Sequence, residues 1–468
     1  MFINACLTCT GQREFYDDAY GQKVSLDFLH DYILGNYRLL YCRTLAAGIN
    51  HFNQTQIILK LLATGTQTQT QHRAEENQLI TATLHNLPSQ RAWKLLQQIR
   101  EHGINNRRAR AIAKQYVTTR GERLAFHAVK YRSKLRAIAT HNHLNLKQIN
   151  SELGPELGDF LYRHWPKHFN TPLFEEFRRG FYSASNIYNL PFTVAEGLAV
   201  KHNIPRERFL QNIEGQMTAG EKLRLQKSAG KVKAKLDLNP QKLSLTKLAL
   251  YVLSLDLDIR KQRQHELEQL LQTSAHKTLR KVPFRLGRVA AVLDRSYSSS
   301  GSSEKRRRPL GIALAVHYLL QAASQNYQPF WTIAVPEPLI VTPYGQTNLV
   351  DPILAAIAWQ PDLIVIVSDG WENDPPGGFA ELLRVYRTKL DPKRQISIVH
   401  CNPVFNANDF TLKQLSSLVP TVGLRDAEEL PVVLEFARFA EGTASLTELE
   451  TYLASRVQHL LASTNLQE

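Results

Sequence analysis

The stretch "VAAVLDRSYSSSGSSEKRRRPLGIALAVHYLL", Val289 to Leu320, decides the fold of the second half of the chain. It begins as a short apolar run typical of a buried strand and ends as an apolar helix. Between the two lie Asp294, Ser296 and Ser298, and then more serines and the basic run Lys305–Arg308. Open α/β sheets bind ligands beyond the carboxyl ends of their strands, and hard divalent cations prefer oxygen ligands. The stretch therefore predicts a cation site at the edge of a sheet.

The sequence after about residue 283 alternates short apolar runs with amphipathic helices. The runs are "VAAVL", "FWTIAV", "LIVT", "LIVIV" and "ISIVH", and helices are expected at Leu310–Ser324, Leu349–Ala358 and Phe379–Leu390. Nearly continuous apolar strands that alternate with helices are typical of a doubly wound α/β sheet covered on both faces. No helix separates the two runs of "FWTIAVPEPLIVTPYG", which predicts a hairpin whose second strand lies at a sheet edge.

Two further oxygen ligands are expected from other strand ends in this half. Thr347 stands just before an expected helix, and Asp369 follows "LIVIV", the most apolar of the strands. With Asp294, Ser296 and Ser298 they would offer a Mg²⁺ ion, or another divalent cation, carboxylate and hydroxyl oxygens. Water and an oxygen from a partner would complete the shell.

The first half of the chain has helical spacing and weak strand signals. Segments such as "AWKLLQQIREHG" and "NPQKLSLTKLALYVLSLDL" fit helices that end at Gly, Asn or Pro, and "TGTQTQTQHR" is expected to be a loop. We therefore expect an all-α module over residues 1–280 and an α/β domain over residues 281–468. The boundary between them should fall within residues 276–288.

Length, charge and cysteine content limit the class of protein. A chain of 468 residues suits two or three domains, and a formal charge of +15 favours a polyanionic partner, most plausibly nucleic acid. An anionic membrane surface, or no such partner, is the alternative. No apolar run reaches the roughly eighteen residues of a membrane span, and no secretory signal is evident, so a cytoplasmic location is expected. Cys6 and Cys9 form a C-x-x-C without further ligands nearby, which favours ordinary thiols over zinc or redox chemistry.

The densest basic stretch, residues 105–144, places its cations on helix faces opposite apolar stripes. At 100° per residue Ala109, Ile112, Ala113 and Tyr116 share one side of the first helix. A second helix carries an apolar stripe through Leu135 and Ile138. An ordinary solvated face would mix charges of both signs, so phosphate contact is the favoured interpretation. The expected RNA-binding residues are Arg107, Arg110, Lys114, Arg120, Arg123, Lys130, Arg132, Lys134 and Arg136.

The D-x-S-x-S of Asp294, Ser296 and Ser298, followed in order by Thr347 and Asp369, resembles the metal-ion-dependent adhesion site of the von Willebrand factor A domain. This resemblance implies a bound divalent cation with one position open to a carboxylate of a partner protein. It implies binding and no catalysis. The insertion "SSGSSEKRRRP" departs from the family pattern. It is expected to be a flexible cationic loop that folds over the site, contacts phosphates or is merely solvated.

The helical half resembles the TROVE module of the Ro autoantigen family through "RRARAIAKQY" followed by "ERLAFHAVKYR". That family joins HEAT-like helical repeats to a C-terminal von Willebrand A domain. The resemblance implies binding of small structured noncoding RNAs and of single-stranded RNA ends, in the quality control of misfolded RNA. The helical half is shorter here, and the family's Trp-Ser-His segment has no counterpart, so His141 and His143 are given no role.

The leading hypothesis is a non-enzymatic RNA-binding protein, part of a ribonucleoprotein, with a separate divalent-cation site. The alternative is a metal-dependent adaptor that recruits a protein, for example an AAA-type ATPase, without RNA. An RNA-processing enzyme is the third hypothesis, and no catalytic constellation supports it, since nothing assigns His317 or His400 such a role.

Overall fold

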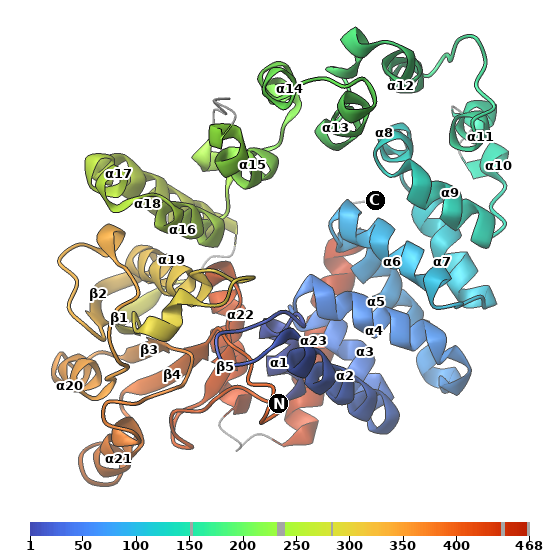
Figure 1. Ribbon diagram of the computed structural model, residues 1–468. Coiled ribbons are helices and arrows are strands. Elements are labelled where there is room, and N and C mark those ends of the chain that lie inside the picture. The colour runs from blue at the N-terminus through green and yellow to red at the C-terminus, as the bar shows by residue number, and fades with distance from the viewer. Residues whose placement is uncertain (150–152, 232–238, 282–283, 441–444, 466–468) are drawn as a thin grey trace. The chain divides into compact units, whose positions relative to one another are not determined.

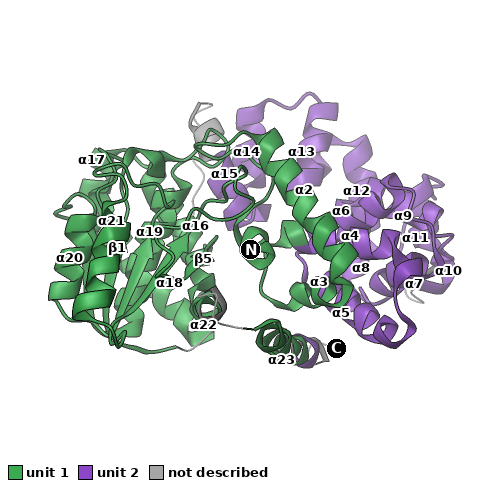
Figure 2. Ribbon diagram, turned by 90° about the horizontal axis from the view of Figure 1, so that it is seen from below, with its two compact units in different colours: residues 1–53, 240–459 green, residues 54–239, 460–468 purple. Residues whose placement is uncertain are grey.

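The computed structural model describes residues 1–149, 153–231, 239–281, 284–440 and 445–465. Two compact units make up the chain: unit 1 comprises residues 1–53 and 240–459, and unit 2 comprises residues 54–239 and 460–468 (Figure 2). Within the described residues helices predominate, and five strands form a parallel sheet in unit 1.

Unit 1 combines this sheet with helices from both ends of the sequence. Its strands are β1 (Leu286–Leu293), β2 (Ser324–Trp331), β3 (Leu363–Val367), β4 (Ser397–Asn402) and β5 (Thr421–Gly423). Its helices are α1 (Phe2–Thr8), α2 (Ala19–Asn36), α3 (Arg38–Arg43), α16 (Leu245–Ser254), α17 (Leu257–Gln262), α18 (Gln264–Lys281), α19 (Arg308–Ala323), α20 (Val350–Ala358), α21 (Gly378–Val385), α22 (Leu430–Ala440) and most of α23 (Leu446–Asn465).

The sheet has the strand order β2-β1-β3-β4-β5, and every neighbouring pair is parallel. The chain leaves β1 towards β2 on one side and later returns to β3 on the other side. The carboxyl ends of β1 and β3 therefore flank the point where the winding direction reverses, which is where open α/β sheets bind ligands.

Alternate residues of the central strands pack on opposite faces of the sheet. Ala290 and Val292 of β1 share one apolar cluster with Ile364 and Ile366 of β3 and with residues of α20 and α21. Helix α19 packs against β1 and β2 (Figure 1), and every residue from Pro309 to Leu320 is buried. A sheet covered on both faces explains the nearly continuous apolar strands seen in the sequence.

Helices α16 and α18 cover the outer surface of α19, which is apolar all round and needs burial on that side too. The contact is close: a Cβ added at Gly311 would lie 2.5 Å from Leu250 Cδ2. Residues 240–280 thus belong to unit 1, although we expected them in the helical module of residues 1–280. Within the expected boundary of 276–288, α18 continues to Lys281, residues 282–283 lie outside the described part, and β1 begins at Leu286.

The N-terminal helix α1 also joins unit 1, because it packs against the edge strand β5. Asn4 Nδ2 donates to the carbonyl oxygen of Thr421 at 3.0 Å, and Gly423 N donates to Asn4 Oδ1 at 3.2 Å. One amide side chain therefore satisfies backbone groups that an edge strand leaves unpaired. The sequence patterns predicted neither the short strand β5 nor this contact.

The prediction of a hairpin in "FWTIAVPEPLIVTPYG" is wrong. Strand β2 begins earlier, at Ser324, and only Phe330 and Trp331 of the expected strand belong to it. "LIVT" forms no strand, because Pro338–Ile340 is a 3₁₀ turn. Proline cannot donate to a ladder, and the guanidinium of the buried Arg260 donates to the carbonyl oxygens of Leu339 and Val341 instead, at 3.0 and 2.9 Å.

Unit 2 is helical. Its helices are most of α4 (His51–Ala63), α5 (Arg73–Asn86), α6 (Ser89–Glu101), α7 (Arg107–Thr118), α8 (Arg123–Lys130), α9 (Arg132–His141), α10 (Leu146–Ile149), α11 (Gly154–Tyr162), α12 (Pro172–Tyr182), α13 (Phe192–Lys201), α14 (Arg206–Ile213) and α15 (Ala219–Lys231). The second basic helix of the prediction is two helices, because Tyr131 leaves the helical region between α8 and α9. The expected loop of residues 64–73 contains two short 3₁₀ turns.

Candidate metal centre and nucleic-acid interface

Asp294 and Asp369 come together because they follow adjacent parallel strands. Leu293, the last residue of β1, pairs with Val367, the last residue of β3. The ladder continues for one more bond, in which Asp294 N donates to the Val367 carbonyl oxygen at 3.0 Å. Each aspartate is only 4% exposed. The two carboxylates therefore lie buried at the point where the winding direction of the sheet reverses.

Hydroxyl groups surround the two carboxylates. Ser296 N donates to Asp294 Oδ1 at 2.7 Å, and the hydroxyls of Ser296 and Ser298 are 3.1 Å apart. Trp371 N donates to Asp369 Oδ1 at 3.1 Å. Ser368 Oγ donates to Asp294 Oδ2 at 3.3 Å. The structure thus gathers four of the five expected ligands, and it adds Ser368, whose position directly before Asp369 was visible in the sequence.

Thr347, the fifth expected ligand, is buried in the loop between β2 and α20. Its backbone joins this loop to the one after β3: Thr347 N donates to Asn373 Oδ1 at 2.8 Å, and its carbonyl oxygen accepts from Asn373 N and Asp374 N. Asn373 lies four residues after Asp369. Thr347 is therefore at the same edge of the sheet, held by backbone contacts.

The two carboxylates oppose each other's ionisation. Burial raises the pKa of Asp294, and burial followed by the charge of Asp294 raises the pKa of Asp369 to about 7. A cation between them would offset both effects. Among the described residues no three His, Cys, Asp or Glu side chains gather as a metal site. A cation here would therefore depend on hydroxyl oxygens as well as on the two carboxylates, a set that suits Mg²⁺.

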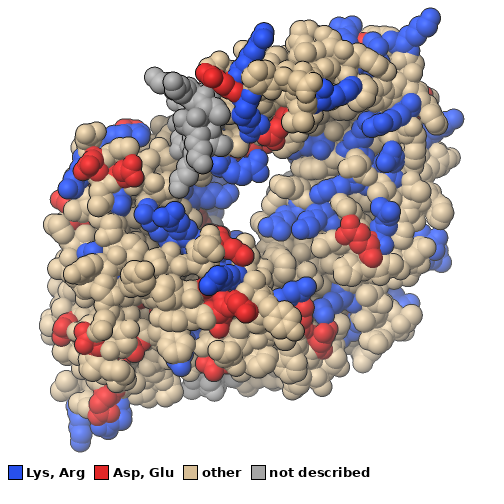
Figure 3. Space-filling model, viewed as in Figure 1, with Lys and Arg blue, Asp and Glu red and all other residues tan. Residues whose placement is uncertain are grey.

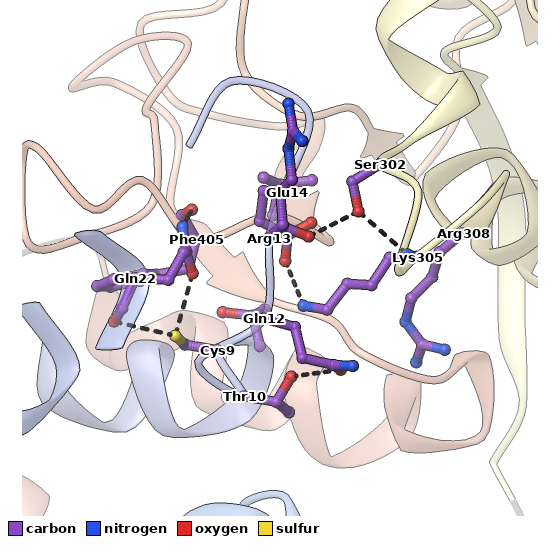
Figure 4. A network of polar contacts seen from close by, with 12 residues as sticks. Cys9, Thr10, Gln12, Arg13, Glu14, Gln22, Ser302, Lys305, Arg308 and Phe405 are labelled. Carbon is purple, nitrogen blue, oxygen red and sulfur yellow. Dashed lines mark hydrogen bonds and ion pairs between the residues drawn. The ribbon is translucent and has the colours of Figure 1, made fainter. Parts of the chain in front are cut away.

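The loop 299–309 is held in place and is not the flexible cationic loop that we expected. Lys305 forms an ion pair with Glu14 (Figure 4), and Arg307 donates to the carbonyl oxygen of Leu253. Arg308 Nη2 donates to Asp426 Oδ1 at 2.9 Å. Three of the four cations therefore have internal partners within unit 1, and Arg306 is exposed.

The cysteines and histidines of unit 1 that the sequence singled out lie buried and hydrogen-bonded or packed within the fold. Cys6 and Cys9 are free and buried, and Cys9 Sγ donates to Gln22 Oε1 at 3.1 Å (Figure 4). His317 lies in α19 with Nδ1 at 2.8 Å from the Tyr327 hydroxyl, and His400 lies in β4 with Nε2 at 3.0 Å from the Ser368 carbonyl oxygen. Burial lowers the pKa of each histidine to about 4.

The basic face of α7 is exposed in unit 2. Arg107, Arg110 and Lys114 are exposed, whereas Ala109 and Ile112 on the opposite side are buried. Arg123 and Arg136 are also exposed on α8 and α9. Figure 3 shows Lys and Arg side chains gathered over the helices of unit 2, with few Asp or Glu among them. The amphipathic pattern thus assigned these faces correctly.

Two cavities open beside these helices, and each gathers residues that are distant in sequence. The first, of about 600 Å³, is lined by Arg73 together with Arg107 and Arg108 at the N-terminus of α7. The second, of about 710 Å³, brings Arg100 and Tyr162 beside Lys134 and Arg136. Arg73, Arg100 and Tyr162 were not predicted, because no local spacing connects them with the basic stretch.

Three of the expected RNA-binding cations contact aromatic rings of unit 2. The Arg132 guanidinium lies 5.2 Å from the Phe160 ring and 5.1 Å from the Trp165 ring, and its Nε donates to the Phe160 carbonyl oxygen. Arg120 lies 4.2 Å from the Tyr116 ring. The third, Lys130, lies 5.6 Å from the ring of Phe126. Arg132 in particular has the contacts of a packing residue.

Fold and sites together define a two-unit protein, with a basic helical unit and a unit in which a parallel sheet carries an acidic and hydroxyl cluster. Its structure is similar to the crystal structure of the Deinococcus radiodurans Ro (RSR) protein, with a TM-score of 0.42 and 14% sequence identity, over 89% of this chain and 94% of that chain. Comparison with known protein families and with curated proteins finds no match. In the described part of the chain, no helix has the length and apolar character needed to cross a membrane.

Proposed function

We propose that this chain is a non-catalytic RNA-binding protein whose unit 2 contacts phosphates and whose unit 1 holds a divalent cation. The observation that carries the proposal is the exposed face of Arg107, Arg110 and Lys114. Cations on a surface with few acidic neighbours attract a polyanion and release its counterions on binding.

The N-terminus of α7 adds a second argument for an anionic ligand. The partial positive charge of a helix N-terminus disfavours nearby cations, yet the exposed Arg107 is the first residue of α7. Arg108, the second residue, already forms an ion pair with the buried Glu76. Arg73 lines the same cavity. A phosphate group would offset this concentration of positive charge and would accept hydrogen bonds there.

The second cavity supplies groups suited to a nucleotide. Tyr162 is 39% exposed, and its hydroxyl lies 3.1 Å from Thr140 Oγ1, which orients the ring. An exposed aromatic ring beside Arg136 and Lys134 can stack on a base while the cations contact the backbone. Unpaired bases stack in this way, which favours RNA with single-stranded ends or loops.

The wider proposal follows the sequence resemblance. The helices of unit 2 would be a HEAT-like module of the TROVE kind, and the parallel sheet of unit 1 a von Willebrand A-type domain. The RNA would then be a small noncoding RNA or a misfolded RNA. At the cation site, Asp294, Asp369, Ser296 and Ser298 would hold Mg²⁺, which when bound supplies an open position for a carboxylate of a protein partner.

A titration of RNA affinity against salt tests the RNA proposal. A labelled RNA hairpin with a single-stranded 3′ end is bound by full-length protein and followed by fluorescence anisotropy. The triple change of Arg107, Arg110 and Lys114 to Ala should lower the slope of log affinity against log salt by about 2, since each phosphate contact contributes about 0.7 on single strands. Affinity should fall alike for different RNA sequences.

The matched control is the triple change of Lys261, Lys389 and Lys393 to Ala, which removes three exposed cations from unit 1. This control should leave the slope unchanged. If both triple variants reduce binding equally, only net charge matters and the RNA face is misplaced. If neither alters binding, the alternative function gains support: a metal-dependent protein adaptor, for which the buried Asp294 and Asp369 cluster is the specific observation.

A further inference from the structure

The segment between α1 and α2 crosses the loops at the carboxyl edge of the sheet. We call residues 13–17 the N-terminal strap. Arg13 N donates to Glu304 Oε2 at 3.2 Å, and the Arg13 carbonyl oxygen accepts from Ser302 Oγ at 2.7 Å (Figure 4). At the other end, Asp17 Oδ2 accepts from Ala407 N at 3.1 Å. The strap is thus bound to the loop after β1 and to the loop after β4.

The middle of the strap contacts the candidate cation site itself. The ring of Tyr16 lies 5.0 Å from the ring of Trp371, two residues after Asp369. Trp371 N in turn donates to Asp369 Oδ1 at 3.1 Å, so the ring of Tyr16 packs on a residue that is bonded to an expected ligand. Phe15 packs edge-on against Tyr297, with ring centroids 6.0 Å apart. Two adjacent strap residues, Phe15 and Tyr16, therefore contact the loops after β1 and β3, from which Asp294 and Asp369 come.

One buried ion pair holds the strap down beside this tyrosine. Glu14 and Lys305 pair with side chains that are 3% and 9% exposed (Figure 4). Tyr16 itself is 47% exposed, so solvent reaches one side of its ring. The half-exposed Tyr16 can therefore move away from the site while the buried Glu14–Lys305 ion pair stays in place.

We propose that the N-terminal strap covers the cation site, and that a carboxylate-bearing protein partner must displace Tyr16 to reach the bound cation. The inference rests on the proposed cation site. Because the strap covers the site, only molecules with an open strap can bind a carboxylate. The apparent affinity is the intrinsic affinity multiplied by the fraction of molecules in which the strap is open.

Acetate is a suitable probe, because it carries the carboxylate and nothing else. Full-length protein is loaded with Mn²⁺ in place of Mg²⁺, and acetate binding is measured by the paramagnetic broadening of its methyl NMR signal. In Tyr16→Ala, which loses the ring contact with Trp371, acetate affinity should rise about fivefold, since such an aromatic contact contributes about 1 kcal/mol. Tyr16→Phe keeps the ring and should leave acetate affinity close to that of wild type.

The matched control is Tyr20→Ala, at a tyrosine that is 77% exposed at the start of α2. It should leave acetate affinity unchanged. Equal acetate affinity in wild type, Tyr16→Phe and Tyr16→Ala, with Mn²⁺ bound in all three, would overturn the inference and leave the cation site standing. Mn²⁺ binding that is as weak in wild type as in Asp294→Asn would overturn the cation site, and the inference with it.

Discussion

Asp294 and Asp369 follow two neighbouring parallel strands, and burial together with the charge of Asp294 raises the pKa of the Asp369 carboxyl. Two buried carboxylates that repel each other destabilise the fold unless a cation or a proton compensates them. A cation site and a serine-rich loop that merely ends a strand should therefore respond differently to a divalent cation.

Changing Asp369 to Asn should separate these two cases. Without divalent cations the variant should be more stable than wild type, because the repulsion with Asp294 is removed. Mg²⁺ should stabilise wild type by about 2.7 kcal/mol at a hundred times its dissociation constant, and the variant far less. Thermal unfolding with Mg²⁺ and with a chelator measures both effects. Asp258→Asn, at an exposed position in α17, is the control, and an equal Mg²⁺ effect in both variants would exclude the site.

Arg132 and Arg136 lie one turn apart on α9 but should respond differently to replacement by Ala. Arg132 packs against Phe160 and Trp165, so its loss should destabilise unit 2 by about 2–3 kcal/mol. Arg136 is exposed, and its loss should change stability by less than about 0.5 kcal/mol while weakening RNA binding. Urea unfolding followed by tryptophan fluorescence, together with RNA titration, measures both. An RNA defect with unchanged stability in Arg132→Ala would show that Arg132 acts on RNA.

Unit 1 should lose stability in mild acid through His317. Burial lowers the pKa of His317 to about 4 in the folded protein, against about 6.5 when unfolded. The unfolded chain therefore binds the extra proton between these values, and stability falls as the pH drops below about 6.5. At pH 5 this histidine should cost about 2 kcal/mol relative to pH 7.

Replacing His317 by Gln should reduce the loss of stability between pH 7 and pH 5 by that amount. The exposed His265, in the same unit, provides the matched control as His265→Gln. Denaturant unfolding at the two pH values gives the comparison. The same loss in His317→Gln as in wild type would show that other groups carry the acid sensitivity.

Local patterns in the sequence predicted what depends on neighbours along the chain. The apolar runs predicted β1 and β3, since a strand buried on both faces must be apolar throughout. Helical spacing predicted the buried and exposed sides of α7, and the strand ends predicted that Asp294 and Asp369 meet. The start of β2 was misplaced and the expected hairpin was wrong. Pro338 has no N–H to donate to a ladder, and the distant Arg260 bonds the carbonyl oxygens of Leu339 and Val341 outside the sheet.

Contacts between segments far apart in sequence were decided by the tertiary structure alone. Nothing in the sequence near Tyr16 indicates Trp371, and nothing near Lys305 indicates Glu14. The assignment of residues 1–53 and 240–281 to unit 1 has the same origin, because the β5 edge and the apolar outer surface of α19 both need cover. Sequence periodicity states which face of an element must be buried. Which distant segment buries it depends on shape and hydrogen-bonding complementarity, which only the folded chain brings together.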